Sequence, residues 1–198
     1  MKDHPIFIES IRHIRSNLDE NNFNALENKV LERLVHTSGD FAIQNLLEFS
    51  KFACKNGIKS LQAGAPILTD TDMAAAAIKP MAEKTTGNKV FSGKRWFEAN
   101  NKSKLTKTAY GIRNGWLELA EKNIGIRSPI VVIGSSPTAL ISLIELLEDS
   151  DHFPSLIIGM PVGFIGVEKS KQKLTETNYP RIIMNSTRGG AAMAAAAI

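Results

Sequence analysis

The chain has 198 residues, of which 43% are hydrophobic and 22% charged, an ordinary composition for one globular domain of this length. Its one cysteine, Cys54, excludes an internal disulfide and a metal site built from cysteines. No apolar run approaches the roughly 20 residues of a membrane span, and the charged N-terminus lacks the apolar core of a signal peptide. A cytoplasmic protein without membrane contact is therefore expected.

Lys and Arg total 24 against 20 Asp and Glu, which gives a net charge of +4 and a pI of about 9.2. The charges are dispersed, so a solvated surface is the simplest explanation of the positive net charge. A site for an anionic ligand is the more specific alternative. The lysine cluster Lys102, Lys104 and Lys107 lacks interleaved aromatic residues. No nucleic-acid partner is expected.

Helical patterns occupy the first sixty residues. A helix is expected to start at His4-Pro5, because proline is tolerated in the first turn, and an apolar stripe follows it. Residues 23–35 and 41–55 show two more helical patterns. Gly57 is expected to end the third of these helices as its C-cap.

From residue 63 onward, short apolar runs alternate with helical stretches. Each run fits a strand that is buried on both faces; the five are AGAPILTD, KVFSG, SPIVVIG, PSLIIGM and YPRIIMN. The helical patterns between them cover residues 72–84, 104–122, 137–149 and 167–176. This alternation predicts an α/β fold with about five parallel strands between helices, preceded by a helical N-terminal segment, in one domain spanning 1–198.

The hexapeptide MAAAAI occurs at residues 73–78 and again at 193–198. No longer similarity surrounds the two copies, so a duplicated domain is not expected. Alanine favours helix and lets a helix approach its neighbour closely. The second copy therefore predicts a C-terminal helix packed against another element.

Ligands of open parallel sheets bind beyond the carboxyl ends of the strands. In this chain that rule selects polar and glycine-rich segments, namely Asp70, Ser135-Ser136-Pro137, Gly163 and Arg188-Gly189-Gly190. Any one glycine is more simply explained by a tight turn, but three such loops on one edge favour a site for an anion. Neither G-x-G-x-x-G nor G-x-x-x-x-G-K-[ST] is present, so the ligand is not expected to be a dinucleotide.

The chain has four histidines, and none is spaced with other ligands for a metal site, so no metal is predicted. His36 follows a helical stretch and precedes Thr37, Ser38 and Asp40. Two interpretations stay open: a favourable charge at a helix C-terminus, or an imidazole that donates a proton near neutral pH. No nucleophile elbow or Ser-His-Asp order accompanies it, so acyl transfer is not supported.

Taken together, RLVHTSGD, GAPILTDTDM, IGSSPTALISLIELLE, IIGMPVGFIGVEKSK and RGGAAMAAAAI resemble the precorrin-8X methylmutase (cobalt-precorrin-8 methylmutase) family of cobalamin biosynthesis. The resemblance implies a flavodoxin-like three-layer sandwich and a homodimer with the site near its interface. It also implies an isomerase that moves a methyl group from C-11 to C-12 of a tetrapyrrole corrin precursor, giving hydrogenobyrinate or cobyrinate. No cofactor is implied.

The resemblance assigns the catalytic position to His36, as an acid or hydrogen-bond donor to the macrocycle, and makes Ser10 and Thr37 substrate contacts. Three departures affect the substrate's carboxylates. Ser135-Ser136 stands where the family commonly has Asn-Ala, Lys107 replaces an arginine, and residues 185–190 lack two arginines of the family's turn. Lysine keeps the charge but loses the two-pronged geometry of arginine.

Three functions are weighed. The isomerase is favoured by His36, Asp70, Pro161 and Gly163, and a non-catalytic corrin-binding or carrier protein of the same fold is favoured by the missing arginines. An α/β nucleotide-binding protein is disfavoured by the absence of phosphate-loop motifs. The sequence does not distinguish a cobalt-containing from a cobalt-free substrate.

Overall fold

The computed structural model describes residues 4–97 and 103–198, so Lys102 lies outside the described residues. Its six-stranded sheet has the order β1-β6-β5-β4-β2-β3. The strands are β1 (Leu47–Phe49), β2 (Ile67–Thr69), β3 (Val90–Ser92), β4 (Ile130–Ile133), β5 (Leu156–Gly159) and β6 (Arg181–Met184). All five predicted strands are present and parallel to one another, and the sixth strand, β1, pairs antiparallel with β6.

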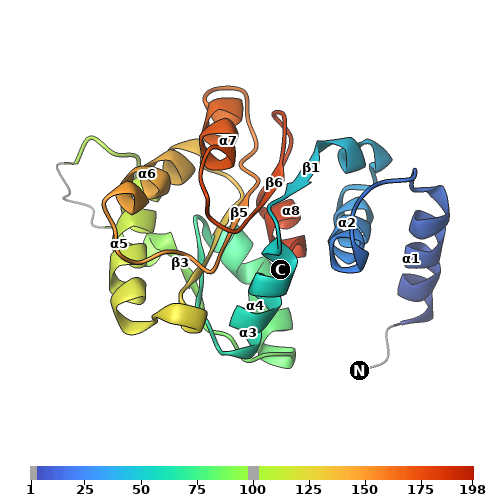
Figure 1. The fold of residues 1–198 in the computed structure, drawn as a ribbon, viewed down its shortest axis with the longest axis horizontal. Helices are drawn as coiled ribbons and strands as arrows, with labels where there is room; N and C mark the ends of the chain where they lie inside the picture. Colours follow the sequence, from blue (N-terminus) through green and yellow to red (C-terminus); the bar gives the residue numbers. More distant parts are fainter. Residues whose placement is uncertain (1–3, 98–102) are drawn as a thin grey trace.

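Helices cover both faces of the sheet, which confirms the predicted three-layer α/β fold (Figure 1). The helices are α1 (Pro5–Asn17), α2 (Ala25–Ser38), α3 (Ala53–Gln62), α4 (Asp72–Lys84), α5 (Lys107–Lys122), α6 (Pro137–Glu148), α7 (Val167–Thr175) and α8 (Ala191–Ala196), with short 3₁₀ helices at Phe41–Leu46, Gly93–Trp96 and Gly125–Arg127. Figure 1 shows α1 and α2 at one end of the molecule and α5 and α6 at the other. No helix among the described residues is both long and apolar enough to cross a bilayer.

Side chains that alternate along each strand divide the interior into two cores, because successive residues of a strand point to opposite faces. Ile130 and Val132 belong to the core under α2, α3, α4 and α8. Val131 and Ile133 belong to the core under α5, α6 and α7. The strands β2, β4 and β5 are therefore buried on both faces, as their apolar runs predicted. The edge strand β3, for which the same burial was predicted, is only partly buried.

The single helix predicted over residues 41–55 is wrong. This stretch forms the 3₁₀ helix Phe41–Leu46 and then β1, and α3 begins only at Ala53. Pairing of Leu47 with Met184 overrides the local helical pattern, because a strand added to the sheet edge satisfies backbone groups of β6.

Gly57 lies inside α3 and does not end it, so the predicted C-cap is wrong. A Cβ at this position would lie 2.8 Å from Cδ2 of Leu156. The glycine lets α3 approach β5 closely.

The two MAAAAI copies lie on helices that pack against each other. Residues 73–78 belong to α4, and α8 contains most of the second copy. Ala75 of α4 and Ala194 of α8 are buried, so small side chains permit the close approach. Contacts of α8 with α2 and β4 connect the α1–α2 pair to the sheet, and the predicted packed C-terminal helix is confirmed.

Candidate active site

His36 lies in the last turn of α2, which ends at Gly39 in the left-handed conformation (φ 65°). Its Nδ1 lies 2.9 Å from Oγ of Ser10 on α1, and the ring of Phe7 meets the imidazole edge-on at 5.2 Å between centroids. The His36 side chain is exposed, and within residues 4–97 and 103–198 no group hydrogen-bonds Nε2. The contacts thus fix the ring and leave one nitrogen for a ligand.

An ion pair holds α1 against α2. The Nε and one Nη of Arg15 donate to the two carboxylate oxygens of Glu32 at 2.6 and 2.8 Å. Glu32 is only 7% exposed, so its carboxylate depends on this bidentate partner. The pair fixes the separation of the helices that carry Ser10 and His36.

Thr37 follows His36 on the exposed end of α2, and its hydroxyl donates to the backbone carbonyl of Arg33 at 2.9 Å. This bond lies within the helix. Thr37 is therefore next to His36 in space, as the sequence implied, but its hydroxyl hydrogen is already engaged.

The turn between β6 and α8 lies beside the end of α2. Arg188 of this turn forms an ion pair with Asp40, which follows Gly39. Gly189 has φ 152°, and a Cβ there would collide with the carbonyl of Met160. The amide of Gly190 donates to that same carbonyl at 2.9 Å. These glycines allow close contact between two loops at the carboxyl edge of the sheet.

The turn between β6 and α8 makes this close contact with the loop that follows β5. The amide of Gly163 donates to the carbonyl of Thr187 at 3.1 Å, so the predicted residues Gly163, Gly189 and Gly190 are brought together. Phe164 and Ile165, at the tip of this loop, are each 89% exposed. The tip presents an apolar surface to its surroundings.

Lys171 binds the backbone of the turn between β6 and α8. Its ammonium donates to the carbonyls of Ser186 and Arg188 at 2.7 and 2.6 Å. The residue is 1% exposed, and burial lowers the pKa of its ammonium to about 8. Sequence reasoning did not select Lys171, although it ends the PVGFIG-x-x-x-SK stretch that carried the resemblance.

Asp70, at the carboxyl end of β2, is also buried, with 1% of its surface exposed. Its carboxylate accepts hydrogen bonds from the amides of Gly134, Ser135 and Ser136 at 3.2, 2.7 and 2.8 Å. Burial raises the pKa of Asp70, and the three amide bonds oppose that effect. The carboxylate shapes the loop between β4 and α6.

Four hydroxyls meet where that loop starts α6 and where α5 begins. Thr106 and Thr138 lie 2.7 Å apart, Thr108 and Ser136 2.7 Å, and Ser136 and Thr138 2.9 Å between side-chain oxygens. Thr106 caps α5 and Ser136 caps α6, so two helix N-termini, which favour anions, face this cluster.

Lys107 and Pro137 occupy the first positions of α5 and α6. The Lys107 ammonium is exposed and lies 5.1 Å from the centroid of the Phe97 ring. Sequence reasoning placed Ser135, Ser136, Pro137 and Lys107 at the site. The neighbouring threonines were missed because only the folded chain brings their hydroxyls together.

The predicted site residues therefore form two groups. The first group is Ser10, His36 and Thr37 with the turn at Arg188; the second is Asp70, the loop at Ser135–Pro137 and Lys107. Among the described residues no hydrogen bond or ion pair joins the groups directly, and α8 contacts both α2 and β4.

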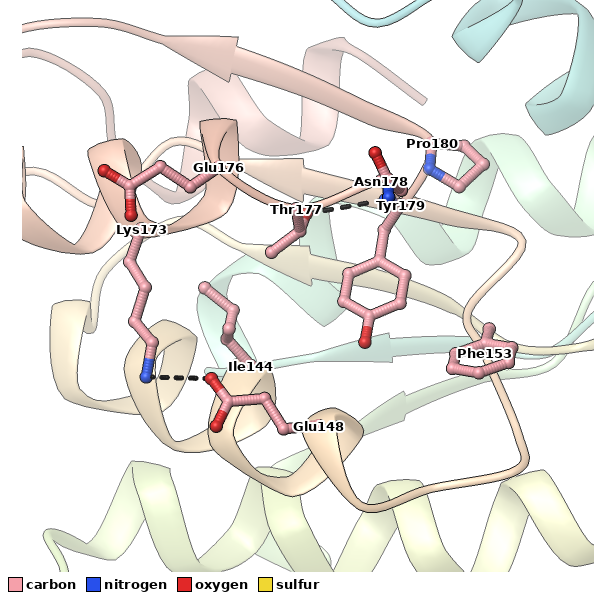
Figure 2. Close-up of a pocket in the computed structure, with 9 residues that line it drawn as sticks. All are labelled: Ile144, Glu148, Phe153, Lys173, Glu176, Thr177, Asn178, Tyr179 and Pro180. Atoms are coloured by element: carbon pink, nitrogen blue, oxygen red, sulfur yellow. Dashed lines mark hydrogen bonds and ion pairs between the residues drawn. The ribbon is translucent and has the colours of Figure 1, made fainter.

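A cavity of about 630 Å³ opens at the amino edge of the sheet, away from both groups. It lies between α6, α7 and the start of β6 and includes Glu148, Lys173, Glu176 and Tyr179 (Figure 2). Figure 2 shows Lys173 turned toward Glu148, with which it forms an ion pair of 3.3 Å. Carboxylates outnumber ammonium groups here, so the cavity is a poor site for an anion.

Comparison with known proteins decides the family. The profile of the family described as precorrin-8X methylmutase matches residues 5–198. The chain belongs to the precorrin-8X methylmutase family. The matched region contains every site residue predicted above, and this membership removes the support for a nucleotide-binding protein.

Similar proteins are named for both forms of the substrate. The chain is 30% identical to the cobalt-precorrin-8 methylmutase of Synechocystis sp., over 98% of this chain and 92% of the relative. It is 33% identical to the precorrin-8X methylmutase of Sinorhizobium sp., over 98% and 90%. The crystal structure of precorrin-8x methyl mutase from Thermus thermophilus superimposes with a TM-score of 0.86 and 32% identity, covering 97% of this chain and 91% of that one. Methylmutases of this family are isomerases of cobalamin biosynthesis.

Proposed function

We propose that the protein moves a methyl group from C-11 to C-12 of precorrin-8X or cobalt-precorrin-8, giving hydrogenobyrinate or cobyrinate. The observation that carries this proposal is the geometry of His36, whose Nδ1 is engaged by Ser10 while Nε2 is open. The reaction is an isomerisation, so a proton lent to the macrocycle returns to the histidine and the product has the substrate's atoms.

His36 acts as the hydrogen-bond donor or acid. When Ser10 donates to Nδ1, the neutral imidazole carries its proton on Nε2 and can donate it to the macrocycle. Phe7 packs on the ring and limits its rotation. A donor held in one orientation lowers the barrier because it does not have to reorganise during the reaction.

The substrate's carboxylates are bound by cations and by helix N-termini. Lys107 is exposed at the start of α5, beside the hydroxyls of Thr106 and Thr108. Arg188 is less available because Asp40 partly neutralises it. Asp70 accepts hydrogen bonds from three amides and so contributes to substrate binding by positioning the loop of Ser135 and Ser136.

A homodimer, acting in the cytoplasm, is part of the proposal. The helices of the first group, α1 and α2, lie at the opposite end of the molecule from α5 and α6, as Figure 1 shows. A second copy would bring a Lys107 group toward a His36 group. The exposed tip of Phe164 and Ile165 fits burial at such an interface. Light scattering coupled to size-exclusion chromatography measures the mass, and a monomer at micromolar concentration would contradict this part.

The activity is tested by anaerobic incubation with precorrin-8X and, in parallel, with cobalt-precorrin-8, while the visible spectrum is followed. Wild type should produce the corrin spectrum, and His36→Ala should be slower by roughly 10²-fold or more. His13→Ala is the matched control, because His13 is an exposed histidine on α1. Binding of both substrates without turnover would favour the carrier alternative, and full activity of His36→Ala would remove the role of His36.

A further inference from the structure

The amino edge of the sheet exposes lysines on α3 and on the turn before it. Lys55 and Lys59 are four residues apart on α3 and so share one face of the helix. The ammonium groups of Lys51 and Lys55 lie 5.1 and 6.0 Å from the centroid of the Phe52 ring. No other charged residue occurs at positions 49–69. Lys51, Lys55 and Lys59, termed the basic area, form no ion pair within the described part of the chain.

Carboxylates gather on the same edge around the pocket of Figure 2. The exposed Glu148 and Glu176 line this pocket of about 630 Å³, and the exposed Asp149 and Asp151 follow directly after α6. Of the described residues that line the pocket, Lys173 alone is cationic, and it is paired with Glu148. The four carboxylates Glu148, Asp149, Asp151 and Glu176, termed the acidic area, therefore keep a negative excess although the whole chain has a net charge of +4.

The two areas are neighbours. Pro180 lines the pocket beside the acidic area and also a smaller one of about 210 Å³, to which Lys59 of the basic area contributes together with Ile126. In Figure 2, Phe153 and Pro180 lie on the side of the larger pocket away from Lys173. Pro180 thus marks the boundary between the acidic and the basic area.

Apolar side chains are exposed among these charges. Phe52, Ile58, Ile126 and Phe153 each have at least 40% of their surface exposed. Exposed apolar side chains surrounded by charged ones indicate a surface that another molecule covers. A molecule that covers both areas must present cations to the acidic area and carboxylates to the basic area. A second copy of this chain meets both requirements when it is turned about a two-fold axis at the boundary.

We propose that two copies of the chain associate through their amino edges about a two-fold axis near Pro180, with the basic area of each copy on the acidic area of the other. Every charge contact is then made twice, and like charges do not meet. The contact leaves the carboxyl edge of both copies open to a substrate. It is independent of the proposed reaction. Combined with the homodimer proposed above, which uses the tip of Phe164 and Ile165, it gives an assembly of four chains.

Charge reversal in one area at a time tests this contact. Lys55→Glu with Lys59→Glu makes the basic area predominantly acidic, and Glu148→Lys with Glu176→Lys makes the acidic area predominantly basic. Either double variant alone would place like charges against each other, so the dissociation constant of the contact should rise on the order of 10²-fold or more. Size-exclusion chromatography with light scattering at low ionic strength should then find two chains of 21.7 kDa for each variant, against four for wild type.

Mixing the two double variants separates a contact between copies from every other use of this edge. The predominantly acidic edge of one variant meets the predominantly basic edge of the other, so the wild-type mass should return, which a misfolded variant could not achieve. Lys79→Glu with Lys94→Glu is the matched control, because it changes the net charge as much as the basic-area variant but on exposed residues of α4 and of the 3₁₀ helix Gly93–Trp96. This control should keep the wild-type mass.

An unchanged mass for both double variants would overturn the inference. Failure of the mixture to associate would also overturn it, because the reversed residues would then contact something other than a second copy. Wild type with two chains and both double variants with one would support the amino-edge contact and contradict the homodimer proposed above.

Discussion

The α1–α2 pair and the carboxyl edge of the sheet use ionisable side chains in opposite ways. In the helical pair, His36 and Arg33 are exposed, and each is held by one or two contacts from α1. At the sheet edge, Asp70 and Lys171 are each 1% exposed and are bonded to backbone amides or carbonyls. Exposed groups remain available to a ligand and contribute little to stability, whereas the buried groups fix loops. Substitutions in the α1–α2 pair should therefore change activity more than stability, and substitutions of the buried groups at the sheet edge should change mainly stability.

The largest effect on stability is expected from Asp70→Ala. One buried and two partly buried amides would lose their acceptor, which lowers the free energy of unfolding by about 3 kcal/mol. Urea denaturation measures the change. Asp72→Ala, which removes an exposed carboxylate paired with exposed Lys94, serves as the control and should have a much smaller effect. Equal midpoints for the two variants would contradict the role given to Asp70.

Gly189→Ala should have the next largest effect, about 2 kcal/mol, because the new Cβ would collide with the carbonyl of Met160 at a backbone angle that suits only glycine. Gly64→Ala is a useful comparison, since Gly64 also has a positive φ (84°) but nothing within 4 Å of its Cβ position. The difference between the two variants, measured by thermal unfolding, isolates the contact between the loops. No difference would mean that the loops can separate easily.

The buried ammonium of Lys171 predicts a dependence on pH. Burial lowers its pKa in the folded state to about 8, from an ordinary value of 10.5. Between these values the unfolded chain binds the proton and the folded chain does not, so this group's contribution to stability rises with pH from about 8 to about 10.5.

Denaturation of wild type and Lys171→Met at pH 7 and pH 9.5 checks this dependence. Wild type should gain stability relative to the variant as the pH rises, while wild type and Lys169→Met, which removes an exposed lysine of the same helix, should differ equally at both pH values. A constant difference between wild type and Lys171→Met would show that the carbonyls of Ser186 and Arg188 fully compensate for burial.

The smallest effect on stability belongs to Ser10→Ala, within about 0.5 kcal/mol of wild type. Its kcat should nevertheless fall about 10-fold, because Nδ1 of His36 would lose the partner that sets its orientation. Steady-state kinetics and thermal unfolding are measured together. Ser16→Ala, on the same helix, should leave both unchanged, and an unaltered kcat for Ser10→Ala would show that Phe7 alone orients the imidazole.

Much of the fold was predictable, because strands buried on both faces leave continuous apolar runs such as IVVI at Ile130–Ile133. The strand β1 was not, since its three residues fit a helical pattern and its pairing partner lies far along the chain. Local sequence cannot reveal a strand that exists only because β6 offers a free edge.

The site was predictable to a different extent. His36 stood out because histidine is rare in this chain, and Ser10 entered only through the resemblance. The burial of Asp70 and Lys171 depends on amides and carbonyls from other loops, which no local pattern encodes.

The short strand β1 also has a consequence for alignment within the site. The chain passes from His36 into β1, which pairs with β6, and β6 continues directly to the turn of Arg188. A slip of one residue in this pairing would move the chain by about 3.3 Å along β6 and turn its side chains to the other face. Groups that act on a substrate tolerate displacements of only about 0.5 Å. Three residues at the edge of the sheet thus determine whether the histidine and the glycine turn face the same ligand.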